Sequence, residues 1–163
     1  MHILIKNKNL IFKDYKIKCA IGKRGIGKKK KEGDFITPVG VFKIKIILYR
    51  KDRVKKLNTI LKILPIRKNM GWCNDPRSKK YNKLITIPST HRHEKLFKKE
   101  NLYDIILVLN FNMNPVKKNK GSAIFIHVAK KNYENTEGCV AVRKLELLKI
   151  LKNIKKNTEV KII

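Results

Sequence analysis

Hydrophobic and polar residues alternate through much of the first fifty residues. The alternation runs through three short stretches, Ile3 to Lys6, Leu10 to Phe12 and Tyr15 to Ile21, and a longer apolar run, Val41 to Tyr49, follows. A period of two places successive side chains on opposite faces of a strand, so we expect antiparallel meander strands with one face in water. Cys19 falls on the apolar face of the third stretch and is predicted to lie in the core.

The second half of the chain combines two apolar runs with one helical pattern. Tyr103 to Phe111 and Ala123 to Ala129 are both strand-like and are separated by a basic turn, so we expect them to pair in one sheet. Leucines and isoleucines then recur at helical spacing within residues 144–156, and Val160 to Ile163 can add a last strand. These patterns predict a mainly β domain with one or two short helices and mostly antiparallel pairing.

Two other stretches carry weaker signals. Arg50 to Ile66 has apolar residues at helical spacing but is short and is stopped by Pro65, so helix and extended chain are equal alternatives. Ser89 to Phe97 has the composition of a helix cap followed by one or two helical turns. Its His91 and His93 invite a metal site, but residues two apart point to different sides of a helix and no second ligand cluster is evident. No metal or other cofactor is therefore predicted.

Length and composition favour one domain. With 163 residues and 42% hydrophobic content the chain can bury a proper core, and no linker divides it, so residues 1–163 are predicted to form a single domain. The three cysteines, Cys19, Cys73 and Cys139, form an odd set without metal-type spacing. Neither a disulfide framework nor a zinc ribbon is indicated, and the sequence leaves open one disulfide between two of them.

The net charge is the most unusual feature of the composition. It is +29, from 41 Lys and Arg against 12 Asp and Glu, and it attracts polyanions of any kind, including nucleic acid, anionic membrane and acidic wall polymers. The lysines are spread along the chain among many isoleucines and asparagines, as biased coding composition alone would give, and no RNA-binding signature is present. The basic loop Gly22 to Gly33 has Gly-x-x-Gly-x-Gly spacing without a helical pattern after it, which argues against a nucleotide site. Nonspecific polyanion binding is expected, and a nucleic-acid-binding domain stays open as an alternative.

One histidine and one cysteine lie at the two ends of a single loop. An apolar run ends on His127, a polar loop follows, and Gly138 and Cys139 lead into the next apolar run. Only a thiolate attacks carbonyls, and a neighbouring imidazole can take the thiol proton. Gly138 lets the backbone approach a substrate, the amides of Gly138 and Cys139 could face an oxyanion, and the Thr136 hydroxyl can close the turn. For these residues alone, a buried core histidine and a buried cysteine is the simpler interpretation.

The stretch from Ile124 to Arg143 resembles the catalytic segment of the L,D-transpeptidase (YkuD-type) family. In that family a strand-end histidine is followed, after a loop, by a Ser/Thr-x-Gly-Cys segment, and the matching positions here are His127, Thr136, Gly138 and Cys139. Many members carry a second histidine before the glycine and an Arg or Asn two residues after the cysteine, where this chain has Glu137 and Ala141. The resemblance therefore assigns the nucleophile to Cys139 and the base to His127 alone, and it supplies no arginine at that place for a substrate carboxylate.

Three further segments follow the order of the family. Gly33-Asp34 with Thr37-Pro38-x-Gly40-x-Phe42 resembles the segment before a strand that lines the catalytic cleft. Trp72 to Pro76 with Tyr81-Asn82, and His93-Glu94-x-Leu96, resemble segments of a short subgroup. Aromatic and amide groups in a loop suit a peptide- or sugar-binding cleft, although Trp72 and Cys73 can equally be core residues. The substrate-binding residues implied by the resemblance are Thr136, Trp72, Asp75, Tyr81, Asn82, His93 and Glu94.

The resemblance spans nearly the whole chain and implies an L,D-transpeptidase-like β-sandwich. The implied reaction is acyl transfer on peptidoglycan stem peptides. Cys139 attacks the carbonyl of the third residue, a diamino acid, His127 moves the proton, and terminal D-Ala leaves. The thioester then passes to an amine of another stem, to a free D-amino acid or to water. Besides nucleic-acid binding, the alternatives are a carboxypeptidase- or amidase-type hydrolase of the same fold and a non-catalytic wall-binding module.

The resemblance also implies a place of action in the periplasm or cell envelope. The N-terminal residues lack a basic region followed by a long apolar one, and no stretch approaches the length of a membrane span. No secretory signal is visible, which leaves an upstream signal outside this chain, another export route, or action inside the cell.

Overall fold

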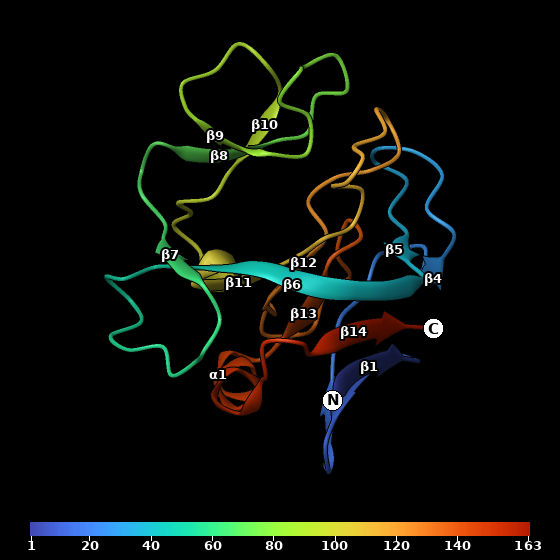
Figure 1. Ribbon diagram of the computed structural model, residues 1–163, viewed down its shortest axis with the longest axis vertical. Helices are drawn as coiled ribbons and strands as arrows, with labels where there is room; N and C mark the ends of the chain where they lie inside the picture. The colour runs from blue at the N-terminus through green and yellow to red at the C-terminus, as the bar shows by residue number, and fades with distance from the viewer.

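Strands make up most of the regular structure in the computed structural model, which describes residues 1–163 (Figure 1). The strands are β1 (His2–Lys6), β2 (Asn9–Phe12), β3 (Tyr15–Lys18), β4 (Ile26–Gly27), β5 (Thr37–Pro38), β6 (Gly40–Tyr49), β7 (Ile63–Pro65), β8 (Met70–Cys73), β9 (Leu84–Thr86), β10 (His93–Lys95), β11 (Ile105–Leu109), β12 (Phe125–Val128), β13 (Val140–Val142) and β14 (Glu159–Ile162). One α-helix, α1 (Lys144–Asn153), and one short 3-10 helix, η1 (Asn101–Tyr103), complete the set. The predicted mainly β fold is confirmed.

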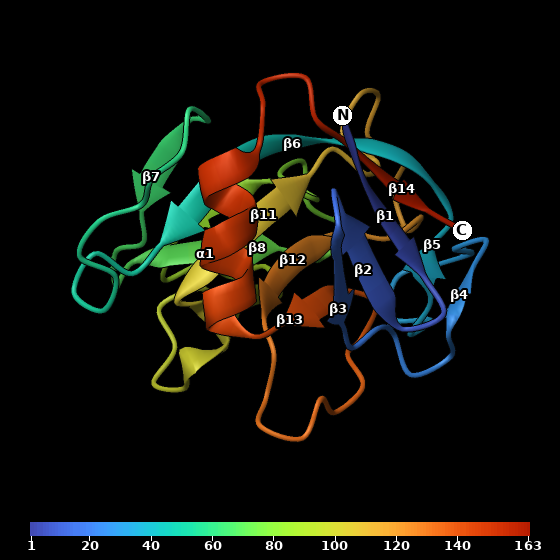
Figure 2. The ribbon, with the colours of Figure 1, turned by 90° about the horizontal axis from the view of Figure 1, so that it is seen from below.

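Nine of the strands form one sheet that closes on itself. Its order is β13-β12-β11-β6-β14-β1-β2-β3, with β7 beside β6, and most neighbours are antiparallel. The pairs β1–β14, β6–β7 and β12–β13 are parallel. Just after β3, the backbone of Ala20 exchanges two hydrogen bonds of 2.8 and 2.9 Å with Ala141 of β13. The two edges of the sheet therefore meet, and the strands fold around a common interior as a β-sandwich whose open edge is bridged (Figure 2).

The sheet carries a different layer on each face at β11 to β13. Ile126 and Val128 of β12 belong to a core of 23 buried residues that includes side chains of β1 to β3 and of α1, and Figure 2 shows α1 crossing this part of the sheet. Phe125 belongs to a second core of eight buried residues, to which Trp72 of β8 contributes. The small sheet β10-β8-β9 lies over this second face, opposite α1 (Figure 1). Alternation along β12 thus sends some side chains toward the helix and others toward the small sheet.

Several element predictions are confirmed. The two apolar runs of the second half are β11 and β12, which pair antiparallel, and the last residues form β14. The helical pattern is α1, which buries Leu147, Ile150 and Leu151. Cys19 is buried, as predicted, although β3 already ends at Lys18.

The predicted helical turns within Ser89 to Phe97 are wrong. His93–Lys95 form β10, which pairs antiparallel with Gly71 to Cys73 of β8. Pairing to a strand twenty residues away outweighs a local capping signal, because a two-residue cap contributes little without a packed apolar face. Arg50 to Ile66 contains no helix either. Leu57 and Leu61 lie in irregular chain and pack against the first core, and β7 follows them.

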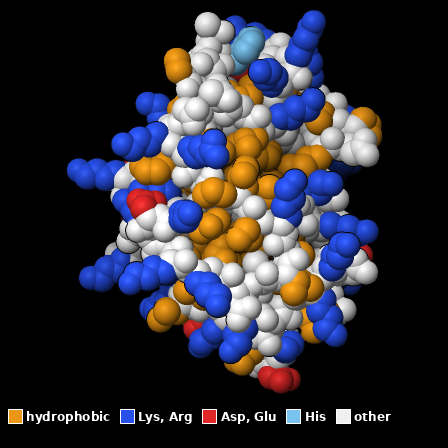
Figure 3. Space-filling view, turned by 60° about the vertical axis from the view of Figure 1, so that its left-hand side comes forward, with side chains coloured by type: hydrophobic (Ala, Val, Ile, Leu, Met, Phe, Trp, Pro, Cys, Tyr) orange, Lys and Arg blue, Asp and Glu red, His pale blue; other side chains and the backbone are white.

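Positive charge covers the surface broadly. Figure 3 shows Lys and Arg side chains distributed over the whole face that it presents, with few Asp or Glu between them. The charge on this face is not gathered into one patch. All three cysteines are free thiols, so no disulfide forms between any two of them.

Candidate active site

The parallel pairing of β12 and β13 brings His127 and Cys139 to the same face of the sheet. His127 lies opposite Ala141 in the register, and Ile126 lies opposite Val140. Because side chains alternate along both strands, Cys139, just before β13, lies on the face of Phe125 and His127. This is the face covered by the small sheet. A histidine and a cysteine separated by a loop in the sequence are therefore neighbours in the fold.

The thiol of Cys139 is protonated and hydrogen-bonded at rest. Its Sγ donates to the carbonyl of Ala123 at 3.1 Å and accepts the amide N–H of Phe125 at 3.4 Å. Burial raises the pKa of Cys139 to about 12, although the Phe125 amide and the charge of Lys29 oppose the rise. The carboxylate of Glu94 adds to it. The resting thiol therefore needs a base before it can act as a nucleophile.

His127 is suited to be that base. Its side chain is buried, and Nδ1 lies 2.9 Å from the carbonyl oxygen of Val128. Burial lowers the pKa of His127, although the bond to Val128 opposes this, so the ring is neutral near pH 7. A carbonyl only accepts, so Nδ1 carries the proton and Nε2 keeps its lone pair. The imidazole can then take a proton through Nε2.

Tyr103 packs against the imidazole of His127, and Glu94 accepts a hydrogen bond from Tyr103. The Tyr103 ring meets the His127 ring edge to face at a centroid distance of 5.4 Å, and its hydroxyl donates to Glu94 Oε1 at 2.6 Å. Lys98 Nζ lies 3.2 Å from the same carboxylate oxygen. Tyr103 fixes the ring plane of His127, and the sequence did not single it out because a tyrosine before an apolar strand is also a common core residue.

The loop before Cys139 is held by Thr136. Its hydroxyl donates to the Cys139 carbonyl oxygen at 2.6 Å and accepts the Gly138 N–H at 3.1 Å. Gly138 has φ +139°, and a Cβ there would lie 2.9 Å from the Ile36 carbonyl oxygen, so only glycine fits without strain. The Gly138 amide is therefore not free to face an oxyanion, contrary to the expectation from sequence. The Cys139 amide has no acceptor within the protein and stays available.

A small cavity opens beside the thiol. Its volume is about 70 Å³, and it is lined by Lys29, Glu32, Gly33, Asn74, Glu94, Ser122, Ala123, Ile124, Glu137, Gly138 and Cys139. Three of these residues are carboxylates and only one is a cation, in a chain where basic residues outnumber acidic ones 41 to 12. The cavity is thus locally acidic on a strongly basic protein, which favours an amine-bearing ligand over an anionic one.

Trp72, Tyr81 and Asn82 lie behind the cavity wall rather than in it. Trp72 Nε1 donates to Asn82 Oδ1 at 3.0 Å, and the same oxygen accepts the amide N–H of Ala123 at 3.0 Å. The Tyr81 hydroxyl donates to the Glu32 carboxylate and accepts the amide N–H of Gly121 at 3.0 Å. These buried groups hold the segment before β12 and a wall carboxylate in place. We infer a positioning role for them instead of substrate contact.

Replacing Asn82 with Ala is expected to lower the free energy of unfolding by about 2–4 kcal/mol. Its amide also donates to the carbonyls of Phe111 and Asn112 at 3.0 and 2.7 Å, so the change leaves several buried groups without partners. Urea unfolding measures the loss. Asn132→Ala, in an exposed loop, is the matched control and should change stability by less than about 0.5 kcal/mol. An unaltered stability of Asn82→Ala with a weakened affinity for substrate would instead support direct contact.

Asp75 and His93 lie outside the cysteine cavity. The Asp75 carboxylate is buried and pairs with Arg77 at 3.1 Å, which lowers its pKa, and it borders a separate hollow of about 450 Å³. His93 borders a third hollow with Ile87 and Pro88, because it points away from its neighbour Glu94 on β10. Of the predicted pair, Glu94 lines the cysteine cavity. The structure contains no cluster of three or more His, Cys, Asp or Glu side chains that could hold a metal ion.

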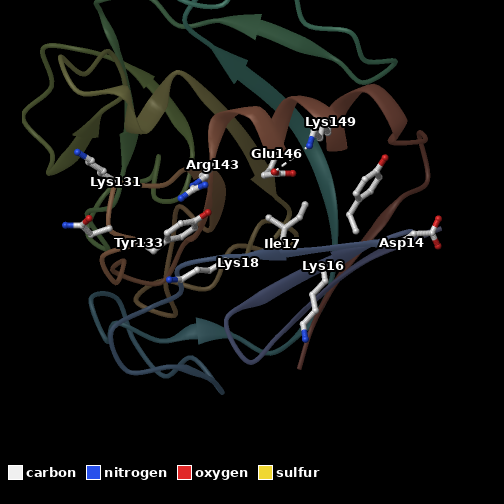
Figure 4. Close-up of a pocket in the computed structure, with 11 residues that line it drawn as sticks. Asp14, Lys16, Ile17, Lys18, Lys131, Tyr133, Arg143, Glu146 and Lys149 are labelled. Carbon is white, nitrogen blue, oxygen red and sulfur yellow. Dashed lines mark ion pairs between the residues drawn. The ribbon is translucent and has the colours of Figure 1, made fainter.

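Another hollow lies on the helix side of the sheet, where Cys139 is not present. It measures about 730 Å³ and is formed by β3, the loop at Lys131 to Tyr133 and the first turns of α1 (Figure 4). Lys18 Nζ lies 5.0 Å from the centroid of the Tyr133 ring, and the guanidinium of Arg143 lies 5.6 Å from it. The residues that line it are mostly basic or polar, and none of them is a Cys, Ser or Thr. Polyanion binding here or elsewhere stays a prediction.

Comparison with known proteins supports the resemblance seen in the sequence. A family model described as the L,D-transpeptidase catalytic domain (YkuD) matches residues 1–162. No curated protein matches the chain significantly. No helix of the structure is both long and apolar enough to cross a membrane.

Proposed function

Because the chain belongs to the L,D-transpeptidase catalytic-domain family, we propose that it is a cysteine acyltransferase acting on peptidoglycan stem peptides. Members of this family act on peptidoglycan peptides and are typically enzymes of the cell envelope. The observation that carries the proposal is the shared face of His127 and Cys139, beside a cavity that reaches the thiol. In our proposal residues 1–163 act as one catalytic domain in the periplasm or envelope.

The first half of the reaction forms a thioester. His127 Nε2 takes the proton from Cys139 Sγ, and the thiolate attacks the carbonyl carbon of the third stem residue. The carbonyl electron pair moves to the oxygen, which becomes an oxyanion near the Cys139 amide. When the electron pair returns, the C–N bond breaks, and the imidazolium gives its proton to the leaving D-Ala amine.

The second half repeats the steps with an acceptor. A neutral amine attacks the thioester carbon while His127 takes one of its protons. The C–S bond then breaks, and the imidazolium gives the proton to the departing sulfur, which restores the Cys139 thiol and the neutral imidazole. The neutral imidazole and the protonated thiol of the resting site suit this scheme, since the proton starts on sulfur and moves only during attack. The carboxylates Glu32, Glu94 and Glu137 around the cavity attract amine-bearing stems, which supports peptide substrates with a diamino acid over nucleic acid at this cavity.

The proposal predicts D-Ala release from a stem tetrapeptide that carries a diamino acid at its third position. The tetrapeptide is incubated with the protein and a free D-amino acid, and the products are identified by liquid chromatography and mass spectrometry. Incorporation of the D-amino acid identifies a transpeptidase, whereas a tripeptide alone identifies a carboxypeptidase of the same mechanism. D-Ala release at the same rate from Cys139→Ala, or no release from the parent protein, would contradict the proposal.

A further inference from the structure

One lysine of this basic protein is buried at the candidate active site. The side chain of Lys29 is 3% exposed, and its Nζ lies 2.6 Å from Asp34 Oδ1, whose own side chain is 2% exposed. The Asp34 carboxylate also accepts the amides of Lys30, Lys31 and Ile36 at 2.7, 3.3 and 3.1 Å. Burial alone would raise the pKa of Asp34, but the Lys29 hydrogen bond and these amides together lower it to about 2. Asp34 is therefore a fixed anion that holds the Lys29 ammonium in place.

Two glycines give the lysine its path to the cysteine loop. A Cβ on Gly121 would lie 2.3 Å from Lys29 Cε and 2.7 Å from its Cδ, so the lysine stem crosses directly over the Gly121 backbone. A Cβ on Gly138 would lie 3.5 Å from Lys29 Nζ. The ammonium therefore reaches the residue before Cys139, and Lys29 lines the cavity beside the thiol.

The hydrogen bonds of this ammonium are incomplete. An ammonium group has three N–H donors, and Lys29 Nζ has two acceptors, Asp34 Oδ1 at 2.6 Å and the Ile36 carbonyl at 3.3 Å. A buried charged donor without a partner is costly, so the third N–H suits an acceptor that arrives in the cavity. At the same place the Gly138 amide is taken by Thr136, which leaves the Cys139 amide as the available backbone donor.

We propose that Lys29 is a catalytic residue that supplies the second donor of the oxyanion hole, together with the Cys139 amide. The inference rests on the proposed acyl transfer. When the Cys139 thiolate adds to the substrate carbonyl, the electron pair moves to the oxygen, and the third N–H of Lys29 hydrogen-bonds that oxyanion. No proton leaves Lys29, and the bond is lost again when the carbonyl re-forms. Asp34 balances the charge of Lys29, so the ammonium acts as a directed donor.

Two reactions of the same thiol test this role. Acetylation by p-nitrophenyl acetate passes through a tetrahedral oxyanion, whereas alkylation by iodoacetamide does not. Both need the thiolate, so the ratio of the two rates at Cys139 cancels any change in thiolate fraction. Peptide mass mapping measures both rates, and Cys139→Ala gives the background from lysine acetylation. In Lys29→Met/Asp34→Asn the ratio is expected to fall by about 10²–10³-fold, as when one oxyanion donor is removed.

The matched control is Lys30→Met, because that side chain is exposed and only its backbone touches Asp34. Its ratio should equal that of the parent protein. If the double variant does not unfold cooperatively, Lys29→Met alone gives the same comparison. An unchanged ratio in a folded Lys29 variant overturns the proposal, even if both rates fall. A parent protein that is alkylated but never acetylated at Cys139 overturns the acyltransferase function itself and this role with it.

Discussion

Replacing Cys139 with Ala is expected to abolish acyl transfer, with a loss of at least about 10⁴-fold in the rate of D-Ala release. The variant lacks the sulfur that forms the thioester, and no other thiol can replace it, because the side chains of Cys19 and Cys73 are buried. Folding should be little affected, since Cys139 is only partly buried and one methyl-sized group remains. His127 and the carboxylates of the cavity stay in place in this variant, but without the thiol they cannot form a thioester.

Intact-mass spectrometry after incubation with a carbapenem measures the nucleophile directly. A β-lactam carbonyl acylates an activated thiol, so the parent protein should gain one adduct and Cys139→Ala none. Iodoacetamide gives an independent check: the native protein should be alkylated first at Cys139, and the denatured protein at all three cysteines. An adduct that persists in Cys139→Ala, or preferential labelling of Cys19 or Cys73, would contradict the assignment.

The strands could be predicted because their burial is locally encoded. In β11 and β12 every residue is buried, and in β1 and β2 buried residues alternate with more exposed ones, so apolar runs and a period of two were both visible. The helix α1 was visible for the same reason, since one face is buried. The residues of the His127 and Cys139 segment alone favoured a buried core histidine and cysteine, and the segment was recognised by its resemblance to the L,D-transpeptidase family.

The rest of the site depends on distant contacts that no local pattern records. Lys29 stands in a run of four lysines, and nothing in that run distinguishes the one that threads over Gly121. From the sequence the Gly138 amide could face an oxyanion, but in the structure it donates to the Thr136 hydroxyl. Trp72 and Asn82 have the residue types of a binding loop, yet they satisfy each other below the surface. A polar side chain in a loop can either contact a ligand in a cleft or hold the wall of the cleft in place. Only its hydrogen-bond partners in the folded protein distinguish the two roles.

The charge of the protein and the charge of its cavity point to different partners. Lys and Arg side chains are spread over the face shown in Figure 3, whereas Glu32, Glu94 and Glu137 line the space beside Cys139. Attraction between exposed charges fades beyond about 10 Å at moderate salt, so the nearby carboxylates dominate the cavity while the lysines dominate the approach. Under the proposed function, an amine of the third stem residue would suit the carboxylates of the cavity, and anionic groups elsewhere on the substrate would suit the surface lysines.

Replacing His127 with Gln is expected to lower the rate of D-Ala release by about 10²–10⁴-fold, as the loss of a general base does. Glutamine has a similar volume and can still lie against Tyr103, but it cannot take a proton from Cys139. Stability should change by less than about 1 kcal/mol, measured by urea unfolding. His93→Gln is the matched control, because His93 borders a different hollow, and it should keep the parental rate.

The dependence on pH separates a lost base from lost packing. A base works only when neutral, and burial lowers the pKa of His127 below its usual 6.5, so the parental kcat/KM should fall only below that pH. In His127→Gln this acid limb should disappear, and the remaining rate should rise with pH toward the thiol pKa of about 12, because only hydroxide then forms the thiolate. If the variant kept the parental acid limb, or if His93→Gln lost as much activity, His127 would not be the base.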